Sequence, residues 1–67
     1  MKFKKSQQVL VISTSYISEK YPSHIGGSAI IKEIIPQEDW LSDFSPEYKV
    51  IINKKEYIIP EYSMEAL

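Results

Sequence analysis

Short apolar runs alternate with polar and turn-forming stretches along the whole chain. Residues 9–12 (VLVI) form the first run, and β-branched side chains dominate it, so the pattern predicts a strand over about residues 8–14. Because both faces of this strand carry apolar side chains, we expect at least partial cover on each side. The run AIIKEII predicts a second strand over about residues 29–35.

Two further strands are expected in EYKVIIN, residues 47–53, and in EYIIP, residues 56–60. Asn53 tolerates a positive φ, so Asn53 and Lys54 can form a two-residue hairpin turn between these strands. With that turn, Val50 faces Tyr57 and Tyr48 faces Ile59. Pro60 has no amide hydrogen to donate and is expected to end the last of these strands.

The remaining segments carry turn signals. Residues 13–27 (STSYISEKYPSHIGG) are rich in Ser, Pro and Gly, and we expect them to form a loop. In the tail EYSMEAL, residues 61–67, apolar side chains recur at a loose helical spacing. We expect one helical or 3-10 turn there, followed by a short edge strand, and no full-length helix in the chain.

A single domain over residues 1–67 is expected, because 67 residues provide only one small core. Four or five short strands cannot form two full sheets, but they can close into a small barrel that exposes no edge. The sequence therefore predicts an all-β fold, namely a small barrel of four to five short antiparallel strands with one short helical turn.

Three stretches, KSQQVLVIS, YPSHIGGSAIIKEI and YKVIINKKEYIIPEYSMEAL, resemble the small SH3-like barrels of the KOW and tudor kind. The matching positions are Val9, Val11, Gly26, Ile59, Pro60, Glu61, Met64, Glu65 and Leu67, whereas Ala29 replaces a glycine that these barrels usually have. The resemblance implies an SH3-like barrel that binds a protein, an RNA or a methylated peptide. In size and style the chain also resembles barrels encoded by phages and mobile elements of low-GC bacteria.

Gly26 and Gly27 directly precede the second apolar run, where their amides could cradle a phosphate. No helix is expected after them and no Lys-Ser or Lys-Thr pair completes a P-loop, so we interpret them as a turn that needs a positive φ. His24 is the only histidine, and the chain has no cysteine to share a metal with it. We expect a solvent-exposed loop histidine without a catalytic role.

Residues 36–47 (PQEDWLSDFSPE) combine acidic and aromatic side chains in a long connection, and long connections are often functional. Trp40 and Phe44 have the i, i+4 spacing of one helical turn. They either plug one end of the barrel, which we favour, or form an exposed anchor for a partner. The residues predicted to contact a partner are Glu38, Asp39, Trp40, Asp43 and Phe44.

Aromatic residues could also surround a cation, as in a methyl-lysine reader of the tudor kind. The candidates are Tyr16, Tyr21, Trp40, Tyr48, Tyr57 and Tyr62. Aromatic side chains on barrel strands more often pack in the core or shield it, and we favour that role here.

All eight basic residues are lysines, and the formal net charge is −1. Nucleic-acid binding usually needs a cationic excess and often uses arginine, so both features disfavour it. If nucleic acid is nevertheless the ligand, the predicted patch comprises Lys2, Lys4, Lys5, Lys54 and Lys55.

These patterns predict a non-enzymatic protein-interaction module whose partner is another protein. The alternative is a KOW-like RNA- or ribosome-associated binding module. We expect no catalytic residue, metal site or cofactor, because the chain has no histidine pair, no cysteine and no phosphate loop. No apolar run approaches the roughly 20 residues that span a bilayer, so we expect a cytoplasmic protein without a membrane partner.

Overall fold

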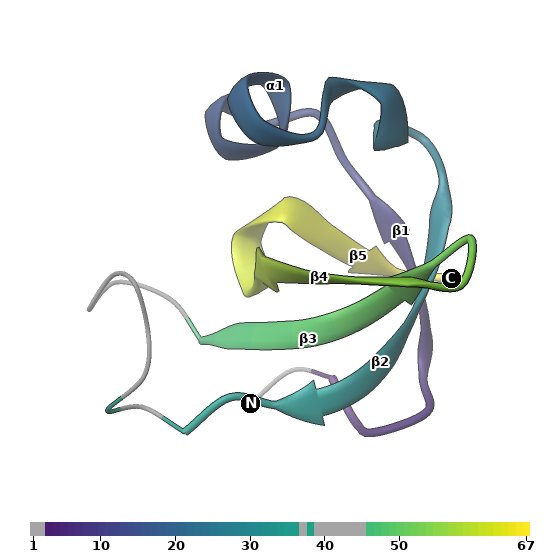
Figure 1. Ribbon diagram of the computed structural model, residues 1–67, viewed down its shortest axis with the longest axis vertical. Helices are drawn as coiled ribbons and strands as arrows, with labels where there is room; N and C mark the ends of the chain where they lie inside the picture. The colour runs from purple at the N-terminus through teal and green to yellow at the C-terminus, as the bar shows by residue number, and fades with distance from the viewer. Residues whose placement is uncertain (1–2, 37, 39–45) are drawn as a thin grey trace.

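Five antiparallel strands form one sheet in the computed structural model, and a short helix lies to one side of it (Figure 1). The structure describes residues 3–36, 38 and 46–67. In chain order the elements are β1 (Gln8–Val11), the helix α1 (Ser15–Lys20), the 3-10 turn η1 (Pro22–His24), β2 (Ser28–Ile34), β3 (Glu47–Ile52), β4 (Lys55–Pro60), the 3-10 turn η3 (Glu61–Ser63) and β5 (Met64–Ala66).

The strands lie in the order β4-β3-β2-β1-β5, and every neighbouring pair is antiparallel. The prediction of short antiparallel strands with a turn and a short edge strand at the end of the chain is therefore confirmed. In the described residues the order of hydrogen-bonded strands ends at β4 and β5, so the sheet is not closed into a barrel. The expected SH3-like barrel is thus not confirmed.

The β3–β4 hairpin has the turn and the register that the sequence predicts. Asn53 and Lys54 both adopt a positive φ, of 51° and 69°, which is the conformation of a type I′ turn. Val50 pairs with Tyr57, and Tyr48 pairs with Ile59. The twist of this turn type matches the right-handed twist of the two strands, but the positive φ of Lys54 is a conformation in which glycine is preferred.

The segment 13–27 was expected to be a loop, and this prediction is wrong because the segment contains α1. Thr14 begins the helix as its N-cap, with an extended backbone and a side-chain oxygen that accepts from the Ile17 amide at 3.4 Å. Its hydroxyl also lies 2.7 Å from the hydroxyl of the buried Ser63. A helix of six residues is not stable alone, so α1 depends on contacts with the rest of the chain, such as the one between Thr14 and Ser63.

The core lies between the sheet and α1. Ile17 of α1 is fully buried among side chains from the strands. The residues of this core are Phe3, Val9, Val11, Ile17, Ala29, Ile31, Tyr48, Val50, Ile52, Ile59 and Met64. Leu10 and Ile12, on the other face of the first apolar run, are half-buried, as the prediction of partial cover requires.

A buried tyrosine links the N-terminal segment to the 3-10 turn η3. Tyr48 is fully buried, and its hydroxyl donates to the carboxylate of Glu61 at 2.5 Å. The same hydroxyl oxygen accepts from the backbone amide of Phe3 at 3.4 Å. The polar end of this large side chain is therefore paired, which removes most of the cost of burying it.

Replacement of Lys54 tests the turn. We expect Lys54→Gly to raise the free energy of unfolding by about 0.5–1 kcal/mol, because a left-handed backbone costs lysine roughly 1–2 kcal/mol and the greater chain entropy of glycine offsets only part of this gain. Urea unfolding measures the change. Lys55→Gly, in the adjacent strand position, is the control and should destabilise; a loss of stability in Lys54→Gly would contradict the turn assignment.

Replacement of Ile17 tests the docking of α1. We expect Ile17→Ala to lower the free energy of unfolding by about 2–5 kcal/mol, because the side chain is fully buried and its removal leaves a cavity. The exposed neighbour provides the control, since Ser18→Ala should change stability by less than about 0.5 kcal/mol. Equal stabilities of the two variants would show that α1 does not pack on the sheet.

Candidate functional site

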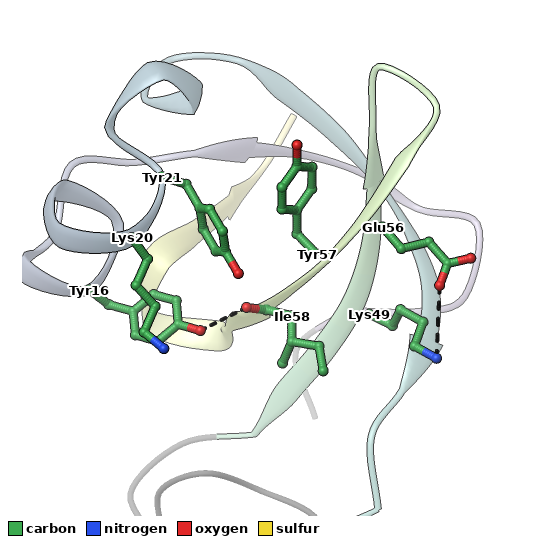
Figure 2. Close-up of a pocket in the computed structure, with 7 residues that line it drawn as sticks. All are labelled: Tyr16, Lys20, Tyr21, Lys49, Glu56, Tyr57 and Ile58. Atoms are coloured by element: carbon green, nitrogen blue, oxygen red, sulfur yellow. Dashed lines mark hydrogen bonds and ion pairs between the residues drawn. The ribbon is translucent and has the colours of Figure 1, made fainter.

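A pocket of about 360 Å³ opens between α1 and the β3–β4 hairpin (Figure 2). The residues that line it are Tyr16, Lys20, Tyr21, Lys49, Glu56, Tyr57 and Ile58. The first two come from α1, Tyr21 directly follows this helix, and the rest come from two adjacent strands. The pocket therefore forms where α1, in the segment that the sequence predicted to be a loop, meets the β3–β4 hairpin.

Aromatic rings form one wall of the pocket. The rings of Tyr21 and Tyr57 meet edge to face, with their centroids 4.9 Å apart, and Tyr16 lies 6.3 Å from Tyr21. His24 packs against Tyr57 from η1 with a centroid distance of 4.8 Å. His24 is half-buried, so the prediction of a solvent-exposed loop histidine is wrong. The His24 ring is partly buried because it packs against Tyr57, which is distant in the sequence.

Tyr16 anchors α1 to the edge strand. Its hydroxyl donates to the backbone carbonyl of Ile58 at 2.9 Å (Figure 2). Burial, and to a smaller extent the nearby Tyr21 and Glu47, raise the pKa of Tyr16 from 10.0 to about 12. The phenol therefore stays protonated over the whole neutral range and keeps its hydrogen bond to the strand.

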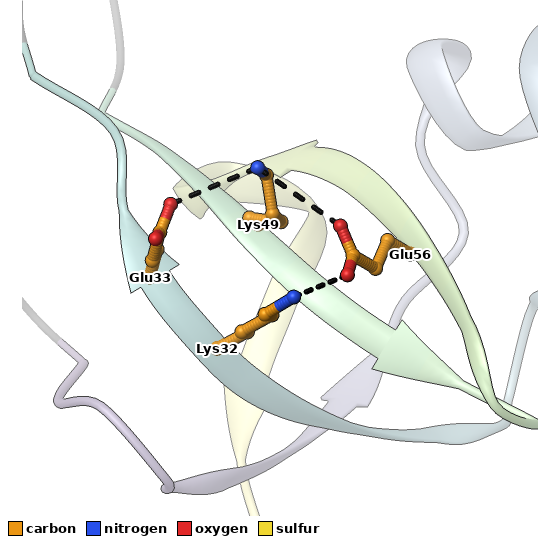
Figure 3. A network of polar contacts seen from close by, with 4 residues as sticks. All are labelled: Lys32, Glu33, Lys49 and Glu56. Carbon is orange, nitrogen blue, oxygen red and sulfur yellow. Dashed lines mark hydrogen bonds and ion pairs between the residues drawn. The ribbon is translucent and has the colours of Figure 1, made fainter.

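Four charged side chains form a network across β2, β3 and β4 (Figure 3). Lys32 pairs with Glu56, and this hydrogen bond is the main cause that raises the pKa of Lys32 and lowers the pKa of Glu56. Lys49 lies between Glu33 and Glu56, at 3.7 Å and 3.9 Å from their carboxylate oxygens. Such exposed pairs contribute little to stability, but they hold Glu56 in its charged form.

Lys20 differs from these paired lysines. Its ammonium nitrogen lies 5.2 Å from the centre of the Tyr16 ring, within the range of a cation–π contact. Among the residues that the structure describes, no carboxylate lies within 4 Å of it. Lys20 thus brings a positive charge to one end of the pocket without an acidic partner.

The acidic and aromatic segment remains largely untested. Glu38 is described and exposed, whereas Asp39, Trp40, Asp43 and Phe44 lie outside the described residues. Whether Trp40 plugs the fold or contacts a partner therefore stays a prediction.

The lysines predicted as a nucleic-acid patch lie on two segments. Lys4 and Lys5 are exposed in the turn before β1, and Lys54 and Lys55 are exposed at the tip of the β3–β4 hairpin. Figure 1 shows that turn and the hairpin tip at separate places on the molecule. Lys2 lies outside the described residues.

The aromatic candidates divide into three groups. Tyr16, Tyr21 and Tyr57 come together at the pocket, whereas Tyr48 is in the core and Tyr62 is 53% exposed at the surface. The remaining candidate, Trp40, lies outside the described residues.

The sequence analysis did not assign Lys20, Lys49, Glu56 or Ile58 to a site with these tyrosines. The i, i+4 spacing of Tyr16 and Lys20 was the available signal, and it has meaning only once α1 is recognised.

The chain has no recognised counterpart among the proteins compared with it: no family model, no curated protein and no solved structure matches it. Within residues 3–36, 38 and 46–67, no three His, Cys, Asp or Glu side chains converge as metal ligands. None of the helices in that part of the chain has the length and apolar character needed to cross a membrane. The pocket must therefore be interpreted from its own geometry.

Removal of the Tyr16 hydroxyl tests its bond to β4. We expect Tyr16→Phe to lower the free energy of unfolding at pH 8 by about 0.5–1.5 kcal/mol, because the bond to Ile58 is lost. The raised pKa adds a pH dependence: the protonated phenol stabilises the fold fully below pH 10, and this contribution is lost as the pH rises through about 12.

Urea unfolding between pH 8 and pH 12 measures both effects. The parent should lose stability more steeply than Tyr16→Phe above pH 10, whereas the control Tyr62→Phe, at an exposed position, should follow the parent. Parallel curves for the parent and Tyr16→Phe would show that the hydroxyl is not engaged in the folded state.

Proposed function

We propose that the protein is a non-enzymatic protein-interaction module, and that its pocket between α1 and β4 binds a peptide segment of a partner protein. The observation that carries this proposal is the concave surface that the rings of Tyr16, Tyr21 and Tyr57 form between α1 and the edge strand β4. Rigid aromatic side chains in a concave site provide a large contact area at low entropic cost, which is typical of protein-binding hot spots.

The polar groups of the pocket support binding rather than catalysis. The Tyr16 hydroxyl is engaged with a backbone carbonyl, and its raised pKa makes it a poor base at neutral pH. The lowered pKa of Glu56 keeps this carboxyl charged, so it cannot serve as a general acid there. The Tyr16 hydroxyl instead links α1 to β4, and Glu56 pairs with Lys32 of β2 and Lys49 of β3.

We further propose that the sheet is a small SH3-like module and that it acts in the cytoplasm. The resemblance of three stretches of the sequence to KOW and tudor barrels supports this proposal, together with the five short antiparallel strands and the 3-10 turn η3 between β4 and β5. The acidic and aromatic segment with Glu38, Asp39, Trp40, Asp43 and Phe44 stays a second predicted contact surface for the same or another partner.

A random heptapeptide library panned against the immobilised chain tests the proposed function. Peptides that enrich are then titrated into the ¹⁵N-labelled protein, and the amide signals that move are assigned. We expect the largest changes at Tyr21, Tyr57 and Ile58, because these residues line the pocket. Failure of any peptide to enrich, or changes confined to residues outside the pocket, would contradict the proposal.

The same titration with single-stranded RNA tests the KOW-like alternative. If RNA binds through the lysines, the signals of Lys4, Lys5, Lys54 and Lys55 should move instead of those of the pocket. The logarithm of the affinity should then fall with the logarithm of the salt concentration, with a slope of about −0.7 for each phosphate contacted. Salt-dependent RNA binding of this kind, without peptide binding, would replace the proposed function with the alternative.

A further inference from the structure

The backbone of β4 presents hydrogen-bonding groups to the pocket. In an antiparallel hairpin with a two-residue turn, the backbone N–H and C=O groups of every second residue bond to the neighbouring strand. The backbone groups of the residues between them point away from that strand. The pairs next to the turn, Ile52 with Lys55 and Val50 with Tyr57, set this alternation. The amide and carbonyl groups of Glu56 and Ile58 therefore point away from β3, and the bond from Tyr16 to the Ile58 carbonyl agrees with that direction.

This edge is only partly occupied. Among the described residues, no group accepts from the N–H of Ile58, and its carbonyl oxygen retains a second lone pair beside the one used by Tyr16. β4 is also the last strand at its end of the sheet. An exposed edge of this kind pairs with one extended segment of another chain.

The two lysines of the pocket lining lie in different surroundings. Figure 2 shows Lys20 beside Tyr16 at one end of the pocket, and Lys49 joined to Glu56 at the other. Lys49 lies between the carboxylates of Glu33 and Glu56, on the face of the hairpin opposite to Tyr57. Among the described residues, Lys20 has no carboxylate within 4 Å, so it is the lysine of the lining that can attract a new acidic group.

We propose that the partner segment is an extended peptide with an aromatic side chain flanked by acidic residues. One of its carbonyl groups accepts from the Ile58 amide. Its aromatic ring lies on Tyr21 and Tyr57, and one of its carboxylates reaches Lys20. This inference rests on the proposed function and adds the chemical class of the partner to it.

Three blocked pentapeptides test the inference: Asp-Ser-Phe-Ser-Asp, its counterpart with Lys in place of both Asp residues, and its counterpart with Ala in place of Phe. In an extended peptide, residues 1, 3 and 5 share one face, so the Phe ring and both carboxylates lie on the same side, and one carboxylate lies towards Lys20 in either orientation of the peptide. We expect the first peptide to bind roughly tenfold more tightly than either counterpart, as measured by NMR titration, because exchanging attraction for repulsion at the Lys20 ammonium group shifts the affinity by about that factor. Hydrogen exchange at the Ile58 amide should slow when it binds.

A matched pair of variants assigns the charge preference to the pocket. Lys20→Gln and Ser18→Glu each change the net charge by one negative unit on α1, but only Lys20 lines the pocket, whereas Ser18 is exposed outside it. Lys20→Gln should reduce the preference for the acidic peptide over the lysine peptide by about threefold, and Ser18→Glu should leave it nearly unchanged. An equal reduction in both variants would overturn the assignment to Lys20.

The outcomes separate this inference from the proposed function. Equal or tighter binding of the lysine peptide at the pocket would overturn the acidic class and leave the peptide-binding function standing. Unchanged hydrogen exchange at Ile58 in the bound state would overturn the pairing with β4. If neither these probes nor any library-selected peptide moves a pocket signal, both the inference and the proposed function fail.

Discussion

Burial of the Ile17 side chain holds α1 against the sheet, and the candidate site depends on this contact. The helix is too short to be stable without it. Once Ile17 is in the core, Tyr16 and Lys20 extend from the helix towards β4, and Tyr21 follows at its end. The Thr14–Ser63 hydrogen bond supports the same arrangement at the start of the helix. A core residue thus determines the geometry of a surface that it does not line.

Two features of the β4 edge limit its pairing with strands of other chains. At β4, the Tyr16 hydroxyl occupies the carbonyl of Ile58, and Glu56 carries a charge on the edge strand itself, where Lys32 of β2 and Lys49 of β3 hold it. Both features oppose indiscriminate pairing with other strands, because a bulky ring and fixed charges restrict what can approach. Among the described residues, the Ile58 amide has no acceptor, so this edge is covered only in part.

The parts of the fold that depend on local chemistry could be predicted from the sequence. The turn at Asn53 and Lys54 follows from the tolerance of asparagine for a positive φ, and it fixes the register of both strands. Gly26 likewise has the positive φ, of 83°, that its place before β2 suggested. α1 could not be predicted in this way, because its stability comes from Ile17 in the core and from Ser63 near the far end of the described chain. Without α1, the tyrosines of the pocket could be named as candidates but not brought together, and the half-buried position of His24 could not be foreseen.

The hydrogen bond between Thr14 and Ser63 joins residues that are 49 positions apart. During synthesis, the N-terminal part of the chain leaves the ribosome well before Ser63 is made. Contacts of such large sequence separation form late, since closing the long intervening loop costs entropy before any contact compensates for it. The strand pairs β2–β3 and β3–β4 can assemble from neighbouring residues, whereas α1 reaches its final position only after η3 has been translated. The pocket is therefore completed only after the chain has been made up to η3, although α1, which forms one side of it, is made before most of the sheet.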